Sequence, residues 1–439
     1  MAAETSKLMS IDGKHTAMNC AASEKVEGSR PGLLSLIEPI VPEQFMSEYW
    51  CVRHLLIHRP ISSLQGFLKS LLDMKIKDML RYAEDPVIVM HMTTDGRYRG
   101  STVSKSQALN FFESGMALYF NLSSFFEDTR EWTNLLAGDL GQLQSRCKAS
   151  LFITPANWTT EQHFDPNENF TIQLRGHKRW NIAPNQSVRH AVDRFTCSDD
   201  AIPPRMSTYY FYKNLAPPDS TCSEEMMPGS MLYLPRGHWH SVESLTESVS
   251  LNFCVVPETW ASFLTPIIER LLTTSPELRE VVNGAVGPAL TRAAAFERLR
   301  EILPLLSRLI ANVRPEQIFP EIAGIPALQS LSPDTPIMRN RLATLVCDPG
   351  DQGAKATITL HNFLGSMPSF AFFGSQPGAA SPAGNETILL TQEQVTVLEW
   401  MMEQDAISLR EIKSHFSQLT ARKIDDFVIS LITTGLFCC

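Results

Sequence analysis

Short apolar runs alternate with helical and turn-like segments over the first 256 residues of the chain. Runs of strand length occur at Val87–His91, Ala117–Asn121 and Ser150–Thr154, and helical spacing occupies Leu64–Leu80. Strands of this length, separated by turns and preceded by helices, predict a mainly β domain over residues 33–256. We expect a double-stranded β-helix, a jelly-roll barrel that closes around its site.

The pattern changes on both sides of this domain. Residues 1–32 are polar and lack periodicity, which predicts a disordered N-terminus. After Pro257 the spacing becomes helical, at Trp260–Leu272 and Leu290–Ile310, so residues 257–345 are predicted to be α-helical. The second stretch carries an apolar stripe and one proline, Pro304, where we expect a kink or a break. The stripe consists of Leu299, Ile302, Leu303, Leu306 and Ile310.

The C-terminal part is predicted to be a linker followed by a small helical domain. Residues 346–385 are expected to form a linker or loop, because 374–385 are rich in Gly, Ser, Pro and Ala. Three short helices follow within residues 386–439, at Thr391–Glu403, Leu409–Phe416 and Ala421–Thr434. Ser408 with Glu411 forms a capping-box pattern at the second helix. Three such helices predict a winged helix, and its charge is acidic.

Composition and charge narrow the classes of protein to which the chain can belong. The chain has 439 residues, of which 44% are apolar, which suits two or three ordinary domains and contains no membrane span. Nine cysteines are scattered without a Cys-x-x-Cys pair, which predicts reduced thiols and a cytoplasmic location, or a nuclear or nucleolar one in a eukaryote. The formal net charge of −9 does not suit nonspecific binding of nucleic acid, so DNA is not an expected partner. A membrane is not expected either, because no stretch approaches 18 uninterrupted apolar residues.

The candidate chemistry lies in two segments. His163 and Asp165 are two positions apart, so on a strand both side chains point to the same side. Two histidines and one carboxylate can hold a divalent iron on one face and leave positions open for a cosubstrate and dioxygen. The second histidine comes from Pro235-Arg-Gly-His-Trp-His240, where His238 and His240 have the same strand parity. Alternation alone does not choose between them.

Three blocks in order make the chain resemble a known family. They are Pro42–Ile57, the segment from His163 through Trp180, and Leu234–His240. Together they resemble the cupin-type JmjC oxygenases, most closely the ribosomal-oxygenase branch, loosely over residues 33–439 and well over 150–255. The resemblance implies iron(II) with 2-oxoglutarate and dioxygen as cosubstrates. It also favours His240 as the third ligand, because the family's last ligand closes a Pro-Arg-Gly-x-x-His run.

The resemblance also implies residues that bind the cosubstrate. Lys178 stands 13 positions after Asp165, where the family places a basic residue that binds the distal carboxylate of 2-oxoglutarate. Lys178 shares strand parity with Trp180, which favours an inward-facing lysine. The chain departs from the family at Phe152, where a tyrosine hydroxyl often contacts the cosubstrate. Thr171 and Asn252 are the candidates to replace that contact.

These observations predict a 2-oxoglutarate-dependent hydroxylase with no catalytic side chain beyond the metal ligands. By resemblance the substrate is a side chain of a protein, such as a ribosomal protein, and the resemblance also implies a homodimer through the helical region. A small-molecule or peptide natural-product hydroxylase shares the same metal pattern, and lysine demethylation uses the same chemistry. A non-enzymatic, chromatin-type binding module is the alternative from another class. The intact ligand set opposes it, as does the acidic C-terminal domain.

Overall fold

The chain divides after Pro257 into two compact units, Met1–Pro257 and Glu258–Cys439. The structure is a computed structural model. It describes residues 18–19, 32–64, 67–94, 98–123, 126, 129–142, 144–199, 201–210, 215–286, 288–318, 332–340, 343–350, 353–360, 385–404, 406–433 and 436–438. Most of the N-terminal segment that was expected to be disordered lies outside these ranges.

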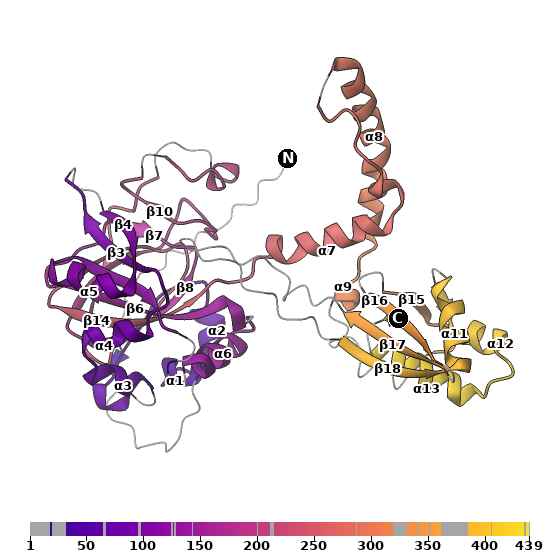
Figure 1. The fold of residues 1–439 in the computed structure, drawn as a ribbon, viewed down its shortest axis with the longest axis horizontal. Helices are drawn as coiled ribbons and strands as arrows, with labels where there is room; N and C mark the ends of the chain where they lie inside the picture. Colours follow the sequence, from indigo (N-terminus) through magenta and orange to yellow (C-terminus); the bar gives the residue numbers. More distant parts are fainter. Residues whose placement is uncertain are drawn as a thin grey trace, which may run out of the picture. The chain divides into compact units, whose positions relative to one another are not determined.

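A nine-stranded sheet forms one half of the first unit (Figure 1). Its order is β1-β2-β12-β8-β14-β6-β5-β3-β4, and every neighbouring pair is antiparallel except β1 with β2. The bounds are β1 Met18–Asn19, β2 Leu55–His58, β3 Val87–Met92, β4 Tyr98–Val103, β5 Ala117–Asn121, β6 Cys147–Thr154, β8 Glu168–Arg175, β12 Met231–Leu234 and β14 Ser248–Val255. The three strands predicted from apolar runs are all present, as β3, β5 and β6.

A five-stranded antiparallel sheet forms the other half. Its order is β10-β7-β13-β9-β11, with bounds β7 His163–Phe164, β9 Lys178–Ala183, β10 Phe195–Thr196, β11 Cys222–Met226 and β13 Trp239–Ser244. Strand neighbours are far apart in sequence, as expected where two sheets are wound together rather than built from hairpins. The mainly β architecture predicted from the sequence is therefore confirmed.

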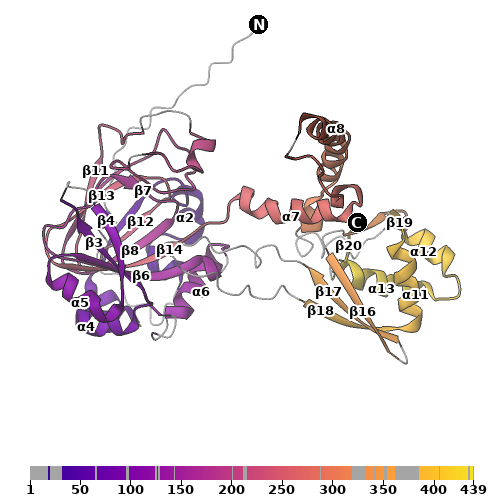
Figure 2. The same ribbon diagram turned by 45° about the horizontal axis from the view of Figure 1, so that its top comes forward.

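Helices cover the outer face of the nine-stranded sheet (Figure 2). They are α1 Leu33–Ile37, α2 Pro42–Glu48, α3 Phe67–Asp73, α4 Ile76–Met79, α5 Lys105–Glu113 and α6 Thr129–Asp139. Their apolar residues join Leu151, Ile172 and Leu251 of the sheet in one core cluster. The remaining side chains of those strands, at alternate positions, face the inside of the barrel.

One predicted helix is two helices in the structure. The sequence predicted one helix over Leu64–Leu80, but Lys75 adopts an extended conformation between α3 and α4. The break lets Leu71, before it, and Met79, after it, both reach the core, where each is fully buried. Packing of both flanking segments thus overrides the helical spacing.

The second unit begins with two helices, α7 Trp260–Thr274 and α8 Ala289–Ala311, followed by α9 Pro315–Ile318. Thr259 caps α7 with a reciprocal capping box to Ser262. Helix α8 contains Pro304 and continues past it, so the expected break does not occur. A proline removes one backbone donor, and the carbonyl it would have satisfied belongs to Arg300, on a solvent-exposed turn where water can serve it.

Small sheets and three helices complete the unit. One sheet has the order β19-β15-β20, with bounds Ala406–Ser408, Pro336–Arg339 and Phe437–Cys438. The other has the order β16-β17-β18, with bounds Ala343–Gly350, Gly353–Leu360 and Asn385–Thr391. The helices are α11 Gln392–Met402, α12 Leu409–His415 and α13 Ala421–Thr433.

The predicted C-terminal helices agree with these bounds to within one residue at each end. Thr391 and Ser408 are N-caps with complete capping boxes, the second through Glu411 as expected. The expected linker over 346–385 differs, because β16 and β17 occupy part of it, and residues 361–384 lie outside the described residues. No described helix is long and apolar enough to cross a bilayer.

Candidate active site

The pairing of β7 with β13 brings the first candidate ligands together. His163 and His240 are Cα partners across the two strands, and their ring centroids lie 4.1 Å apart. Asp165 follows β7 directly and turns back over both rings. Its Oδ2 lies 3.8 Å from His163 Nε2 and 3.7 Å from His240 Nε2. The structure thus brings together all three residues that the sequence proposed as ligands, with ligand atoms within 4.8 Å of one another.

Backbone carbonyls orient both imidazoles. His163 Nδ1 lies 2.7 Å from the carbonyl oxygen of Glu161, and His240 Nδ1 lies 3.0 Å from that of His238. A carbonyl only accepts, so each Nδ1 carries the proton and each Nε2 keeps its lone pair. Both lone pairs are therefore available on the side where Asp165 lies, which is the arrangement of metal-binding histidines.

The protonation states also suit a cation. Burial lowers the pKa of His163, as does the neighbouring His240, and burial lowers the pKa of His240. Burial alone would raise the pKa of Asp165, but Arg194 and the two histidines together lower it. The three ligands are therefore neutral, neutral and anionic near neutral pH, the state in which they bind metal.

Asp165 has an unused ligand atom. Its Oδ1 is buried and has no hydrogen-bond partner among the described residues, and the closest cation, Arg194 Nε, is 3.6 Å away. The backbone of Asp165 is fixed, because Gly237 N donates to its carbonyl oxygen at 2.8 Å. A buried carboxylate oxygen without a donor is costly. A divalent cation between the three residues removes that cost, so the set fits a metal.

Lys178 begins β9 and points into the barrel. Its side chain is 3% exposed, and burial lowers the pKa of its amine to about 7. Trp180 lies inward as well, whereas Arg179 faces outward and pairs with Glu225 and Glu243, so the predicted parity is confirmed. Within the described part of the chain no carboxylate pairs with Lys178. A buried amine without a counter-ion is a site for an anion from solution.

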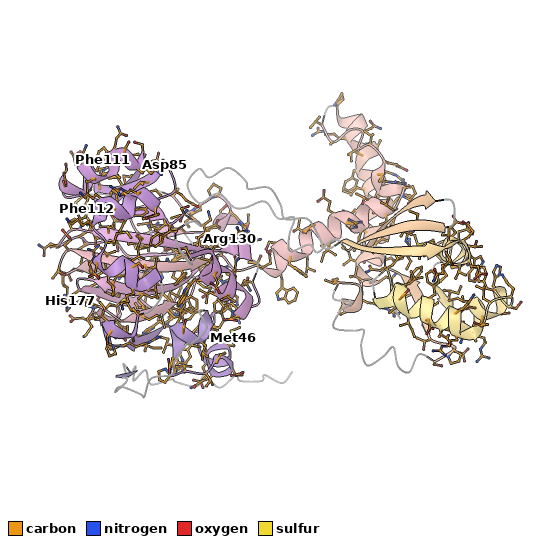
Figure 3. The ribbon with its side chains drawn as sticks, turned by 60° about the horizontal axis from the view of Figure 1, so that its bottom comes forward. Met46, Asp85, Phe111, Phe112, Arg130 and His177 are labelled. Atoms are coloured by element: carbon orange, nitrogen blue, oxygen red, sulfur yellow. The ribbon has the colours of Figure 1, made fainter. Side chains whose placement is uncertain are left out.

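A tight turn sets the direction of Lys178. Gly176 has φ of +73°, and a Cβ there would lie 2.1 Å from the carbonyl oxygen of Glu247. His177 is exposed at the periphery of the unit, and its backbone N donates to Thr246 Oγ1 at 2.9 Å (Figure 3). The close approach requires glycine at 176. It places the next residue outside and Lys178 inside.

The position where the family resemblance implied a tyrosine is apolar here. Phe152 lies on β6, and Lys178 Nζ is 6.0 Å from the centroid of its ring. Tyr119 on β5 is the Cα partner of Phe152, and the two ring centroids are 4.6 Å apart. Burial raises the pKa of the Tyr119 phenol. Asp165 also raises it and Arg194 lowers it, so both charged groups lie close enough to affect this side chain. The neighbouring strand therefore supplies a phenol beside the position that lacks one.

Thr171 and Asn252 lie on the inner face of the nine-stranded sheet. They are Cα partners on β8 and β14, both nearly buried. Thr171 Oγ1 donates to Asn252 Oδ1 at 3.2 Å, and Asn252 Nδ2 donates to Asn169 Oδ1 at 2.9 Å. The two side chains predicted to contact the cosubstrate thus hold one another in place.

The turn before β13 is tied to the nine-stranded sheet by Glu168. This carboxylate is fully buried, and burial raises its pKa. It accepts from Tyr233 Oη at 2.6 Å, from Cys51 Sγ at 3.2 Å and from the backbone N of Arg236 at 3.3 Å. The network fixes the Pro235–Gly237 turn, which in turn positions His240 and, through Gly237, Asp165.

Three other residues near the site are His238, Arg194 and Tyr119. His238 does not join His163 and Asp165; it is half-buried, and burial together with His54 lowers its pKa to about 4. Arg194 and Tyr119 lie near Asp165 but were not predicted. Neither has a local motif, because each reaches the site only through strand pairing, of β10 with β7 and of β5 with β6.

Comparison with known proteins places the site within a family domain. Residues 126–263 match the family model described as the JmjC domain. An uncharacterised Bacillus subtilis protein, YxbC, is 27% identical over 65% of this chain and 90% of its own length. Ribosomal oxygenase 2 of Rattus norvegicus is 26% identical over 54% of this chain. A Dictyostelium discoideum protein named bifunctional lysine-specific demethylase and histidyl-hydroxylase NO66 is 23% identical over 58%.

The chain spans about half the length of the last two relatives, 50% and 49%. Among solved structures, Escherichia coli ycfD is similar with a TM-score of 0.40 and 13% identity, over 91% of this chain and 98% of that one. A further structure of the same ribosomal oxygenase, in complex with cobalt and 2-oxoglutarate, has a TM-score of 0.38, 14% identity and the same coverage.

Proposed function

We propose that this JmjC-domain, 2-oxoglutarate-dependent oxygenase hydroxylates a side chain of a protein. In this class iron(II) is the metal, and 2-oxoglutarate and dioxygen are the cosubstrates. When bound, the iron supplies redox chemistry: 2-oxoglutarate is decarboxylated to succinate with one oxygen atom, and the other enters a C–H bond. His163, Asp165 and His240 are the residues that we propose hold the iron.

The observation that carries this proposal is the buried amine of Lys178, which pairs with no carboxylate among the described residues, because an anionic cosubstrate would supply the missing charge partner. Lys178 is the Cα partner of Ser244 on β13, four residues from His240. At about 3.3 Å per residue, these positions are about 13 Å apart along the strand. A lysine side chain and a dicarboxylate as long as 2-oxoglutarate can share that distance. We therefore assign the distal carboxylate to Lys178 and the keto-acid end to the metal.

The remaining residues orient the cosubstrate and exclude water. We propose that Thr171 and Asn252, and Tyr119 in place of the missing tyrosine, line the route between the metal ligands and Lys178 and donate to cosubstrate oxygens. Trp180 stacks on His240 at 5.8 Å between ring centroids and packs with an apolar cluster beneath it. An apolar surface of this kind excludes water and so strengthens the electrostatic contacts of a bound anion.

The decisive experiment measures coupled turnover by the full chain. The protein is loaded anaerobically with iron(II), then given 2-oxoglutarate, dioxygen and peptides tiled from ribosomal proteins. We expect succinate release that depends on one peptide, and a gain of one oxygen atom in that peptide by mass spectrometry. The variant His163→Ala is the control and should release neither product. No peptide-dependent succinate above that control, from any peptide, would contradict the proposal.

The same assay separates the alternatives. Turnover only with free amino acids or small peptides would indicate a small-molecule or natural-product hydroxylase. Formaldehyde release from methyl-lysine peptides would indicate demethylation, which the name of the Dictyostelium relative includes.

We propose that α8 mediates a homodimer. Phe296, Leu299, Leu303 and Ile310 lie on this helix, and each side chain is between 42% and 55% exposed. Large exposed apolar residues that recur at helical spacing are typical of an interface. Sedimentation analysis should give a dimer for the wild type and a monomer for Leu299→Glu/Leu303→Glu. A monomeric wild type would contradict the assignment.

We propose that residues 386–439 form a winged-helix-like module that does not bind DNA. The segment has four basic and eight acidic side chains, a net charge of −4. All four cations already have a carboxylate within 4.0 Å: Arg410 with Asp334, Lys413 with Asp425, Arg422 with Asp426 and Lys423 with Glu393. Phosphate contacts need free cations. Micromolar binding of duplex DNA by the full chain, falling steeply with salt, would support the chromatin-module alternative instead.

We also propose a reducing, cytoplasmic compartment for the protein. Six described cysteines, which include buried Cys147 and exposed Cys197, are free thiols. Free thiols on the surface are maintained where glutathione and thioredoxin keep them reduced.

A further inference from the structure

A second group of metal-binding side chains lies inside the same barrel, separate from the triad. It consists of His54, which precedes β2, together with Cys222 and Glu224 of β11. Glu224 Oε1 lies 3.5 Å from His54 Nε2 and 3.4 Å from Cys222 Sγ. The ligand atoms of all three residues are within 4.8 Å of one another. The group shares no residue with the triad.

The strand register fixes where this group lies. On β11 the alternate residues Ser223 and Glu225 are exposed, so Cys222 and Glu224 face inward. Ile182 on β9 is the Cα partner of both Cys222 and His240. Cys222 and His240 are thus in one row across the sheet, two strands apart, which is about 10 Å.

The burial of the group favours a cation over a solvated surface pair. The side chains of His54 and Glu224 are only 8% and 13% exposed. The Cys222 thiol lies against the Glu224 carboxylate, and a divalent cation between the two would stabilise both as anions.

We propose that His54, Cys222 and Glu224 form a second metal site that takes a zinc-class divalent cation. Thiolate, imidazole and carboxylate are the three ligand types of zinc, and three protein ligands leave a fourth position for water. The thiolate disfavours magnesium and calcium, which prefer oxygen ligands only. A cation here would join β11, the edge of the five-stranded sheet, to β2 of the nine-stranded sheet.

One side chain, that of Trp180, connects this site to the triad. Trp180 is the Cα partner of Glu224, and its ring stacks on the imidazole of His240. A cation that fixes Glu224 would thus fix the strand segment on which the His240 ring rests. The second site is a positioning site in this scheme and contacts neither cosubstrate nor substrate.

Cobalt(II) is the probe, because it reports a thiolate ligand directly. Metal-free full chain is titrated anaerobically with Co²⁺, and near-ultraviolet thiolate-to-cobalt absorption is recorded together with the number of ions bound. The triad contains no thiolate, so this absorption cannot come from the triad. We expect two ions per chain with the thiolate band, and competition by Zn²⁺ should remove the band.

Matched variants decide the assignment. Cys222→Ser should lose the thiolate band and one of the two ions, while its visible d–d absorption shows that the triad and the fold are intact. His163→Ala/Asp165→Ala should keep the thiolate band and lose the other ion. Cys197→Ser, which removes an exposed thiol elsewhere, should behave as the wild type. His54→Gln should weaken the binding of the ion that gives the thiolate band.

Three outcomes would overturn the site. They are no thiolate band in the wild type, a band that persists in Cys222→Ser, or two ions bound by Cys222→Ser. The first is also the result expected if His54 and Glu224 form an ordinary ion pair. None of these readouts depends on oxygenase turnover, so the second site and the proposed function can fail independently.

Discussion

The two ends of the inward face of the five-stranded sheet have opposite character. At one end β7 and β13 present neutral imidazoles and a carboxylate, His163, His240 and Asp165. At the other end β9 presents the amine of Lys178, which is buried and has no counter-ion in the part of the chain that the structure describes. The first end suits a cation and the second an anion. A ligand that bridges a metal and an ammonium group, such as an α-keto dicarboxylate, is oriented by that difference alone.

The largest effect should come from removing a ligand at the metal end. We expect His240→Ala to abolish binding of iron(II), a loss beyond the roughly 10- to 100-fold typical of residues that only orient a ligand. His238→Ala is the matched control and should bind iron as the wild type does. Anaerobic calorimetry, in a Cys222→Ser background so that one site is counted, measures both. The reverse result for the two histidines would show that His238 is the ligand.

Binding of the cosubstrate at the Lys178 end should be lost independently of metal binding. Lys178→Met is expected to weaken 2-oxoglutarate binding and leave metal affinity unchanged, because it removes the charge partner that we propose for the distal carboxylate. Loss of one partner from a buried charge pair costs about 2–5 kcal/mol, or roughly 30-fold to several thousand-fold in affinity. Fluorescence or calorimetric titration of the metal-loaded variant tests this. Unchanged affinity would show that another residue binds the distal carboxylate.

The turn that separates the two ends can be tested through stability. Gly176→Ala should destabilise the protein by about 1–3 kcal/mol from backbone strain, with further loss from the contact with Glu247. Gly138→Ala on α6 is the control, since a Cβ there meets nothing within 4 Å, and it should be neutral or slightly stabilising. Urea denaturation measures both. Equal stability of the two variants would mean that Gly176 does not constrain the turn.

The smallest effect expected is a dependence of cosubstrate affinity on pH. The pKa of Lys178 without ligand is lowered to about 7, and a bound anion raises it. Below pH 7 the amine is already charged, so affinity should be constant. Above pH 7 binding must take up a proton, and affinity should fall by up to about tenfold per pH unit. Lys178→Arg, which stays charged, should show no such fall if it binds. A flat profile for the wild type would argue against an amine partner.

Sequence reasoning succeeded where neighbouring residues determine the outcome. The His163-Phe-Asp165 triplet places two candidate ligands on one side of a strand through spacing alone. Thr391 and Ser408 mark helix starts because each capping box closes within three residues. The inward side of Lys178 followed from its parity with Trp180, which is also a local property.

Sequence reasoning failed, or left alternatives open, where segments that are distant in the sequence meet. The helical spacing of Leu64–Leu80 gave no sign of the break at Lys75, which packing on the sheet imposes. His238 and His240 have equal parity, and the register of β13 on β7 is what brings one of them to His163. No local pattern marks Arg194 or Tyr119, since each is carried to the site by a neighbouring strand.

The sequence by itself therefore determined the chemistry available to this protein: a metal-binding triplet, a third histidine, an inward lysine and a set of capped helices. Only the tertiary structure decided which of these residues share a space. Side-chain direction follows from backbone alternation over a few residues, whereas proximity depends on the pairing of strands far apart in the chain. The group of His54 with Cys222 and Glu224 is the clearest case, because 168 positions separate His54 from Cys222 and nothing near either residue indicates the other.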